Sequence, residues 1–202
     1  MKLERNTSGA IGTNVYLVTD GDACILIDPA DDLEVTRRFL AGRVPELIVC
    51  THQHLDHTAS AAALSRELGC PIAAHALDAA AICTEGRENV AGISGYEVPE
   101  RIDRILEEGD TVEAGKCRLA VIHTPGHTPG GICLHDPDDA VLIAGDTLFA
   151  QSTGRTDFPE GSESDMHLSI RKLAKLPDET KVFPGHGPST TIGAERWWME
   201  QY

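Results

Sequence analysis

Histidine and aspartate are concentrated in one short segment, THQHLDH, which places His52, His54, Asp56 and His57 within six residues. Alternate residues of an extended loop point the same way, and a turn into a helix would bring Asp56 and His57 back to the same pocket. Imidazole and carboxylate groups are the usual ligands of zinc, iron or manganese. Histidines that only form hydrogen bonds at a strand end are the alternative, but the grouping of four such side chains favours a metal site.

Three more residues of ligand type stand directly after predicted strands. They are His127 in HTPGHTPGG, Asp146 in AGDT and His186 in PGHGP. Strand ends beside glycine-rich turns are common places for ligand sites, because glycine lets the backbone pass close to the site. Taken alone, each of these residues could also serve only to stabilise a turn. Together with the first cluster they provide enough ligands for two metal ions of roughly four to five coordination.

The first half of the chain alternates β-rich apolar runs with helical patterns that could position these ligands. Gly21 and Asp22 predict a hairpin turn, Asp31 and Asp32 could cap a helix, and Gly69 ends the helix after the histidine cluster. Strands are predicted at 14–18, 23–28, 47–50 and 71–74, and helices from 31 to about 41 and at 58–68.

The second half is dominated by strands. The stretch 84–99 has no clear period and is interpreted as a loop or insertion, and 147–162 is interpreted as a long loop. No linker divides the chain, so we expect a single domain over residues 1–202. Strands are predicted at 104–106, 111–112, 116–123, 131–135, 140–144 and 182–183, and helices at about 164–176 and 192–202.

THQHLDH, TPGHT, GDT and PGHG, in this order, resemble the motifs of the metallo-β-lactamase superfamily. GDTLFAQSTGRTDFPEGS and PGHGPSTTIGAE resemble the short, single-domain hydrolases related to glyoxalase II, the hydroxyacylglutathione hydrolase. The resemblance implies an α/β fold, a four-layer αβ/βα sandwich of two mixed sheets flanked by helices, with the metal site at one edge. It also implies that one metal ion is held by His52, His54 and His127, a second by Asp56, His57 and His186, and that Asp146 bridges both.

The activity implied by the resemblance is that of a binuclear hydrolase that acts on an anionic thioester such as S-lactoylglutathione. A metal-bridging hydroxide would be the nucleophile, Asp56 and Asp146 the catalytic carboxylates, and zinc the expected metal, with iron or manganese as alternatives. Arg155, in STGRTD, could bind the substrate with its fork of donors or form an ion pair with Asp157. Asp28 could orient a ligand histidine or serve only as a turn residue.

Other functions stay open. A persulfide dioxygenase shares the GRTDF segment but works with one Fe(II) ion, and a lactonase or β-lactamase fits GRTDFPEGS less well. A metal-stabilised binding domain without catalysis would need a closed ligand shell, whereas ligands shared between two metals leave positions for water. Longer glyoxalase II enzymes carry a C-terminal helical region that helps to bind glutathione, whereas only residues 187–202 follow His186 here, so the identity of the thioester is left open.

Charge and composition exclude several classes of protein. The 202 residues include 17 Lys and Arg against 32 Asp and Glu, a formal charge of −15 that repels nucleic acid phosphates. With no run near the ~18 apolar residues of a membrane span and no secretory signal pattern, we expect a cytoplasmic protein without membrane or nucleic-acid partners. The six scattered cysteines are expected to be buried free thiols, and the oligomeric state is not predicted. The remaining histidines are expected to be structural or surface residues: His75, His123, His135 and His167.

Overall fold

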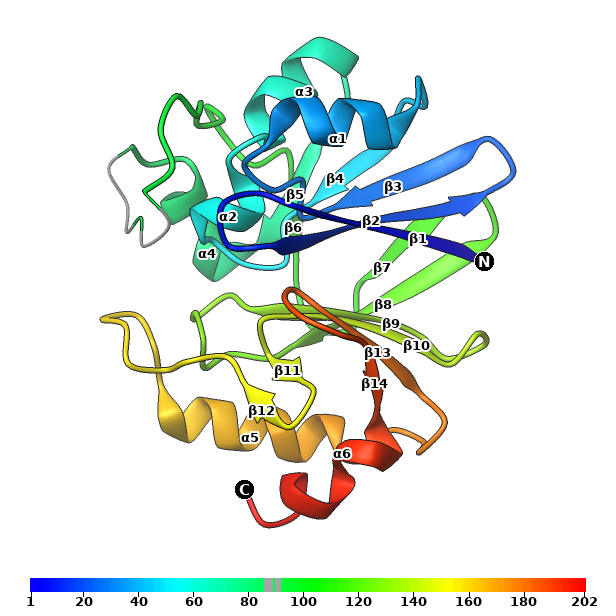
Figure 1. Cartoon of the computed structure of the whole chain (residues 1–202), viewed down its shortest axis with the longest axis vertical. Coiled ribbons are helices and arrows are strands. Elements are labelled where there is room, and N and C mark those ends of the chain that lie inside the picture. Colours follow the sequence, from blue (N-terminus) through cyan, green and yellow to red (C-terminus); the bar gives the residue numbers. More distant parts are fainter. Residues whose placement is uncertain (86–88, 90–91) are drawn as a thin grey trace.

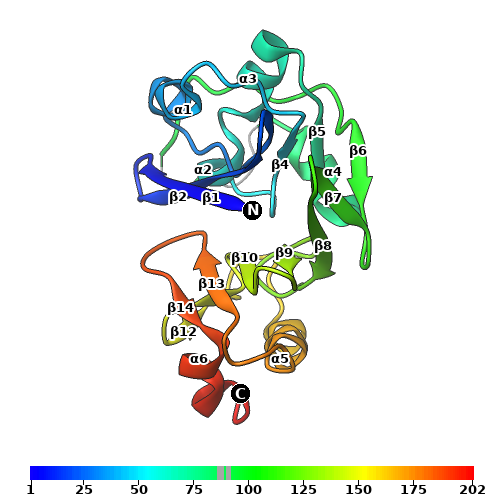
Figure 2. The same ribbon diagram turned by 90° about the vertical axis from the view of Figure 1, so that its right-hand side faces the viewer.

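Two six-stranded sheets lie face to face at the centre of the computed structural model, and helices cover the outer face of each sheet (Figure 1). The structure describes residues 1–85, 89 and 92–202. From top to bottom in Figure 1 the layers are helices, sheet, sheet and helices, and the turned view in Figure 2 keeps the same order. The predicted four-layer α/β sandwich is therefore confirmed.

The first sheet uses its strands in chain order. The first three strands pair antiparallel and the later ones parallel. Parallel neighbours need crossover connections, and helices supply them on the outer face. The strands are β1 (Lys2–Ser8), β2 (Thr13–Asp20), β3 (Ala23–Ile27), β4 (Leu47–Val49), β5 (Ile72–His75) and β6 (Arg104–Leu106). The helices are α1 (Leu33–Leu40), α2 (Leu55–Thr58), α3 (Ala61–Leu68) and α4 (Ala76–Ile82).

The second sheet has the strand order β14-β13-β10-β9-β8-β7, in which only β10 and β13 pair parallel. Its strands are β7 (Thr111–Ala114), β8 (Cys117–His123), β9 (Ile132–Asp136), β10 (Val141–Gly145), β13 (Lys181–Pro184) and β14 (Thr190–Thr191). The helices on its outer face are α5 (Glu163–Leu173) and α6 (Ile192–Met199), and a separate hairpin is formed by β11 (Leu148–Phe149) and β12 (Ser152–Thr153).

Three apolar layers hold the sandwich together. Along β2, Val15 and Leu17 pack toward the helices, whereas Tyr16 and Val18 pack between the sheets, because successive strand side chains point to opposite faces. The third layer, which includes Met166, lies between the second sheet and helices α5 and α6. Full burial of such side chains contributes roughly 1.5–3 kcal/mol each, so the strand ends and the loops that leave them are firmly placed.

The helix predicted at 58–68 is wrong in its boundaries, because the structure has two helices there. The backbone N–H of Ser60 donates to the carbonyl of Ala30 at 2.9 Å, so it does not continue the helical ladder from α2. This contact ties the end of the histidine cluster to the loop after β3. The break between α2 and α3 follows from a tertiary contact that the sequence pattern does not show.

Several elements were not predicted: β1, α4, β14 and the β11–β12 hairpin inside the loop expected at 147–162. β1 has a polar sequence, KLERNTS, because it is an edge strand with much of its surface exposed. The loop predicted at 84–99 contains residues 86–88 and 90–91, which lie outside the described residues, and its described part contains no helix or strand. All six cysteines are free and all but Cys83 are buried, as predicted.

Candidate metal centre

The loops that follow β4, β8, β10 and β13 bring the seven predicted ligands together at one edge of the sandwich. Their ligand atoms form three overlapping groups, and within each group the atoms lie within 4.8 Å of one another. The groups are His52, His54 and His127; His52, His57 and Asp146; and Asp56, His57 and His186. Asp146 thus stands next to members of both predicted ligand triads. The first triad is His52, His54 and His127, and the second triad is Asp56, His57 and His186. The role of Asp146 as their common ligand stays a prediction.

Distances between the ligand atoms suit a metal ion. Around a tetrahedral zinc ion with bonds of about 2.0–2.1 Å, ligand atoms lie about 3.3 Å apart. Here His186 Nε2 lies 3.1 Å from Asp56 Oδ2, His57 Nε2 lies 3.4 Å from Asp146 Oδ1, and His127 Nε2 lies 3.5 Å from Asp146 Oδ2. Six buried side-chain atoms in the described part of the chain have no hydrogen-bond partner, and two of them, His52 Nε2 and Asp146 Oδ1, belong to predicted ligands. Buried polar atoms are normally paired, so these atoms fit a cation at this position.

On the side of the first sheet, Asp28 orients two of the histidines. His57 Nδ1 donates to Asp28 Oδ2 at 2.9 Å, which leaves His57 Nε2 to face the centre. The Thr51 hydroxyl donates to the same carboxylate at 2.7 Å, and its oxygen can accept from His52 Nδ1 at 3.1 Å. Of the two roles considered for Asp28, the structure shows the orienting contact. Such carboxylates set the tautomer and ring position of a metal-binding histidine.

The other two histidines of the first triad are oriented from the loop after β12. His54 Nε2 donates to Glu160 Oε1 at 3.0 Å, so His54 Nδ1 faces His127 Nε2 at 2.9 Å. His127 Nδ1 in turn donates to the carbonyl oxygen of Arg155 at 2.7 Å. Each of these histidines therefore presents one nitrogen to the centre and uses the other in a hydrogen bond.

Asp78 joins the two ligand loops on this side. Its fully buried carboxylate accepts hydrogen bonds from the backbone N–H of Gln53, the hydroxyl of Thr128 and the backbone N–H of Gly130. Burial raises the pKa of Asp78 even though these donors oppose the shift. Since Gln53 lies between two ligands and Thr128 follows His127, Asp78 fixes the distance between the two loops.

β2 holds the loop that carries His186. The side-chain amide of Asn14 donates to the carbonyls of Pro184 and Gly187, each at 2.9 Å. The Tyr16 hydroxyl donates to the Pro184 carbonyl at 2.6 Å. Because β2 belongs to the first sheet and β13 to the second, these contacts set the spacing of the two sheets at the metal centre.

Gly185 is required by the close packing of the ligands. A Cβ atom at this position would lie 2.1 Å from Asp146 Oδ1 and 2.6 Å from His57 Cε1. Real Cβ atoms essentially never come so close to another heavy atom. The glycine in PGHG therefore makes room for ligands from two other loops.

The surroundings of His52 and His57 shift the pKa values of these two histidines in opposite directions. Burial, together with the neighbouring histidines, holds the pKa of His52 well below its ordinary value, which favours the neutral imidazole that a metal ion would need. Burial would also lower the pKa of His57, but Asp56, Asp146 and Asp28 outweigh it and raise that pKa well above its ordinary value. A buried group of carboxylates that stabilises positive charge in this way also favours a metal cation.

A pocket of about 480 Å³ opens onto the metal centre. Five predicted ligands line it, together with Ile11, Phe149, Gly154, Arg155, Phe158 and the β12 strand; the ligands are His54, Asp56, His127, Asp146 and His186. The Arg155 guanidinium lies 4.2 Å from the ring centroid of Phe158 and forms an ion pair with Asp157 at 2.6 Å. The ion pair considered for Arg155 is therefore present, and substrate binding by Arg155, which lines the pocket, stays a prediction.

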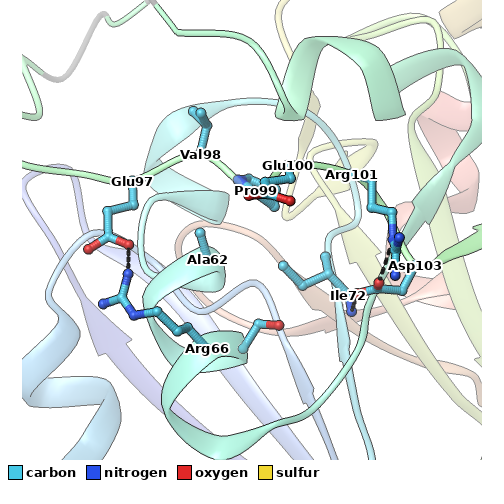
Figure 3. A pocket seen from close by; sticks show the side chains of 10 residues that line it. Ala62, Arg66, Ile72, Glu97, Val98, Pro99, Glu100, Arg101 and Asp103 are labelled. Atoms are coloured by element: carbon cyan, nitrogen blue, oxygen red, sulfur yellow. Dashed lines mark hydrogen bonds and ion pairs between the residues drawn. The ribbon is translucent and has the colours of Figure 1, made fainter.

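A second pocket, of about 430 Å³, lies over α3 and the segment 97–103 (Figure 3). None of the predicted metal ligands is among its lining residues. Four of its charged side chains pair with one another, Arg66 with Glu97 and Arg101 with Asp103. The pocket at the metal centre is therefore the candidate functional site.

The chain belongs to the metallo-beta-lactamase superfamily, because the model of that family matches residues 8–186. Membership of this family and the clustered His and Asp side chains support a metallo-enzyme. Among named relatives, the probable metallo-hydrolase YqgX of Bacillus subtilis is 30% identical over 97% of this chain and 95% of its own length. A hydroxyacylglutathione hydrolase of Rhizobium etli is 41% identical over 69% of this chain, a match that covers 47% of that protein.

Solved structures of several differently named proteins share this fold. BLEG-1, titled a B3 metallo-beta-lactamase, has a TM-score of 0.87 and 32% identity, and the match covers 96% of each chain. TTHA1623, titled as a di-iron-bound form, has a TM-score of 0.84 and 37% identity over 95% of this chain and 96% of that chain. ETHE1 from Myxococcus xanthus has a TM-score of 0.75 and 26% identity over 97% of this chain and 82% of that chain. The fold is thus shared by proteins of different names.

Residues that the sequence analysis missed lie behind the ligands. Asp78, Glu160, Asn14 and Thr51 carry no ligand spacing of their own, and Glu160 was noticed only as part of the PEGS segment. The other histidines lie outside the centre, as predicted, although His75 and His123 stack on each other with ring centroids 4.0 Å apart. Only the ligand positions have a sequence signal, because the supporting contacts join segments far apart in the chain.

Proposed function

We propose that this protein is a binuclear metal-dependent hydrolase of anionic thioesters, with S-lactoylglutathione as the test substrate. The observation that carries the proposal is the arrangement of two ligand triads around Asp146, open to a pocket that contains one arginine among aromatic side chains. Bound metal ions would supply an acidified water as nucleophile and a Lewis acid for the thioester carbonyl.

The residues of the chain prepare this chemistry. Asp28 and Glu160 hold His57 and His54 in the tautomers that leave one nitrogen free for a metal. Asp146 would bridge the two metal positions, and Asp56 would complete the second triad. Because all these groups are buried or nearly so, they are already in place before a substrate binds.

Arg155, Phe149 and Phe158 support the proposed substrate class. The aromatic rings provide an apolar surface for the acyl and thiol portions, and the guanidinium provides a bidentate donor for a carboxylate. The ion pair with Asp157 would then exchange for a contact with the substrate. The relative named hydroxyacylglutathione hydrolase supports a thioester, although it matches only part of this chain.

The expected metal is zinc, and the neighbour titled as di-iron-bound supports iron as well. Manganese is compatible with the same N and O ligands. None of the helices in the described part of the chain has the length and apolar character needed to cross a bilayer. We further propose that the chain forms one domain, works in the cytoplasm, and has no nucleic-acid or membrane partner.

Metal analysis combined with one variant tests the proposal. The protein, purified without chelator, is expected to contain about two metals per chain and to hydrolyse S-lactoylglutathione without oxygen. His186→Ala should lower the occupancy toward one metal and abolish most of the hydrolysis. One iron per chain with oxygen uptake on glutathione persulfide, little changed by His186→Ala, would replace the proposal with a mononuclear dioxygenase.

A second candidate is hydrolysis of β-lactams, which is supported by the similarity to BLEG-1 over nearly the full length of both chains. The same binuclear centre could attack an amide carbonyl in a strained ring. A chromogenic cephalosporin, assayed beside S-lactoylglutathione at equal enzyme concentration, separates the two. A higher kcat/KM for the cephalosporin would make β-lactams the preferred substrates.

A further inference from the structure

The 154–162 loop, which forms a wall of the pocket, also contacts two histidines of the first triad. Glu160 Oε1 accepts from His54 Nε2 at 3.0 Å, and the Arg155 carbonyl accepts from His127 Nδ1 at 2.7 Å. Phe158 lies beside both rings, with centroid distances of 5.3 Å to His54 and 6.1 Å to His127. A loop placed to touch substrate is therefore bonded to the back of the metal ligands.

The loop is also attached elsewhere, and Gln53 Nε2 donates to Glu160 Oε1 at 3.4 Å. Near its ends, the Gly154 N–H donates to the Thr147 carbonyl at 3.4 Å and the Ser162 N–H donates to the Gly126 carbonyl at 2.8 Å. Between these points the Arg155–Asp157 ion pair and the Gly161-to-Phe158 hydrogen bond lie within the loop. The contacts to the two histidines are thus among those that hold the middle of the loop.

The second triad is held by other parts of the chain. Asp28 orients His57, the hydroxyl of Thr13 donates to Asp56 Oδ2 at 3.1 Å, and Asn14 holds the loop of His186. Asp28 also reaches His52 of the first triad through Thr51. The contacts to His54 and His127, however, come from the pocket wall, and none of the contacts named for the second triad does.

We propose that Glu160 is a positioning residue that couples the 154–162 loop to metal binding by His52, His54 and His127. The inference rests on the proposed metal ligands. Coordination through His54 Nδ1 withdraws electrons from the ring and strengthens the Nε2–H donor, so the hydrogen bond to Glu160 tightens. Metal binding then orders the loop, and by linkage a ligand that orders the loop increases the affinity of this triad for metal.

Zinc titration of metal-free protein, in competition with a chromophoric chelator, tests the positioning role. Glu160→Gln is expected to weaken one of two zinc sites about tenfold, and Glu160→Ala up to about a hundredfold, the range for carboxylates that orient metal ligands. Glu163→Gln is the matched control, since Glu163 is exposed at the start of α5, and it should leave both affinities unchanged.

Double variants assign the affected site. In a His186→Ala background, which disables the second triad, Glu160→Gln should weaken the remaining zinc site. In a His127→Ala background it should leave the remaining site unchanged. Equal effects in both backgrounds, or no effect in the first, would overturn the assignment of Glu160 to the first triad.

Hydrogen–deuterium exchange of the 154–162 amides measures the coupling without any activity assay. Zinc should slow exchange in the wild-type loop, and Glu160→Gln should remove most of this protection while Glu163→Gln keeps it. Wild-type protein that binds two zinc ions without protecting the loop would overturn the coupling alone. Wild-type protein that binds no zinc at this centre would overturn the proposed metal ligands, and the coupling with them.

Discussion

Replacement of Gly185 by alanine tests the packing of the metal centre most directly. The added Cβ would lie 2.1 Å from Asp146 Oδ1, about 1.3 Å short of the distance at which ordinary contacts begin. It would also lie 2.6 Å from His57 Cε1, so neither ligand can move toward the other. A displacement of about 1 Å in a reacting group costs on the order of 10²-fold in rate. We therefore expect Gly185→Ala to lower activity at least about 10²-fold.

Metal content should fall in the same variant, because the displaced Asp146 is the predicted ligand of both ions. The assay is zinc occupancy after dialysis, together with hydrolysis of S-lactoylglutathione and the melting temperature of the metal-free protein. Gly185→Ala is expected to change metal binding far more than the melting temperature.

Gly187→Ala is the matched control two residues away. At this position φ is +74° and nothing lies within 4 Å of the added Cβ, so the cost is backbone strain of roughly 1–2 kcal/mol. Gly187→Ala should lower the melting temperature by a few degrees and keep both metals. Full metal occupancy and near-normal turnover in Gly185→Ala would refute the proposed ligand geometry.

Three further predictions concern Asp146, Arg155 and His75. Asp146→Ala should release metal and lower activity at least about 10²-fold, measured by elemental analysis and kinetics; retention of both ions would show that Asp146 is only a turn residue. Arg155→Ala should raise KM more than it lowers kcat, and Arg155→Lys should rescue incompletely, whereas lower thermal stability at unchanged KM would favour the ion pair with Asp157. Burial, together with the stacked His123, lowers the pKa of His75 to about 4, so the folded state resists its protonation. The contribution of His75 to the free energy of unfolding is therefore retained above pH 6.5 and lost as the pH falls toward 4, by about 2 kcal/mol at pH 5 in urea unfolding. His75→Asn should keep the acceptor for the Leu77 N–H and remove this pH dependence; an unchanged slope would contradict the assignment to His75.

The grouping of the seven candidate ligands could be predicted because the signal of each is local. His52, His54, Asp56 and His57 are within six residues, and the other ligands stand in glycine-rich turns directly after apolar strands. Strand periodicity predicted where those strands end, and the ends of strands determine where loops meet. The α/β class followed from the same alternation of strands and helices.

Weak local sequence signals account for most of the elements that were predicted wrongly or not at all. The polar β1 and the two-residue strands of the β11–β12 hairpin have too little apolar pattern to be recognised. The break between α2 and α3 arises from the contact of Ser60 with Ala30, which no helical pattern contains. In each case a partner elsewhere in the chain determines the local structure.

Which nitrogen of each histidine faces the centre was decided only by the tertiary structure. His54 turns Nδ1 inward because Glu160 takes Nε2, whereas His57 turns Nε2 inward because Asp28 takes Nδ1. Glu160 lies 106 positions from His54 in the sequence, so no spacing rule relates them. Residue types with short spacing predict that a metal can bind, but its ligand atoms and their rigidity depend on hydrogen bonds that exist only after both sheets have packed together.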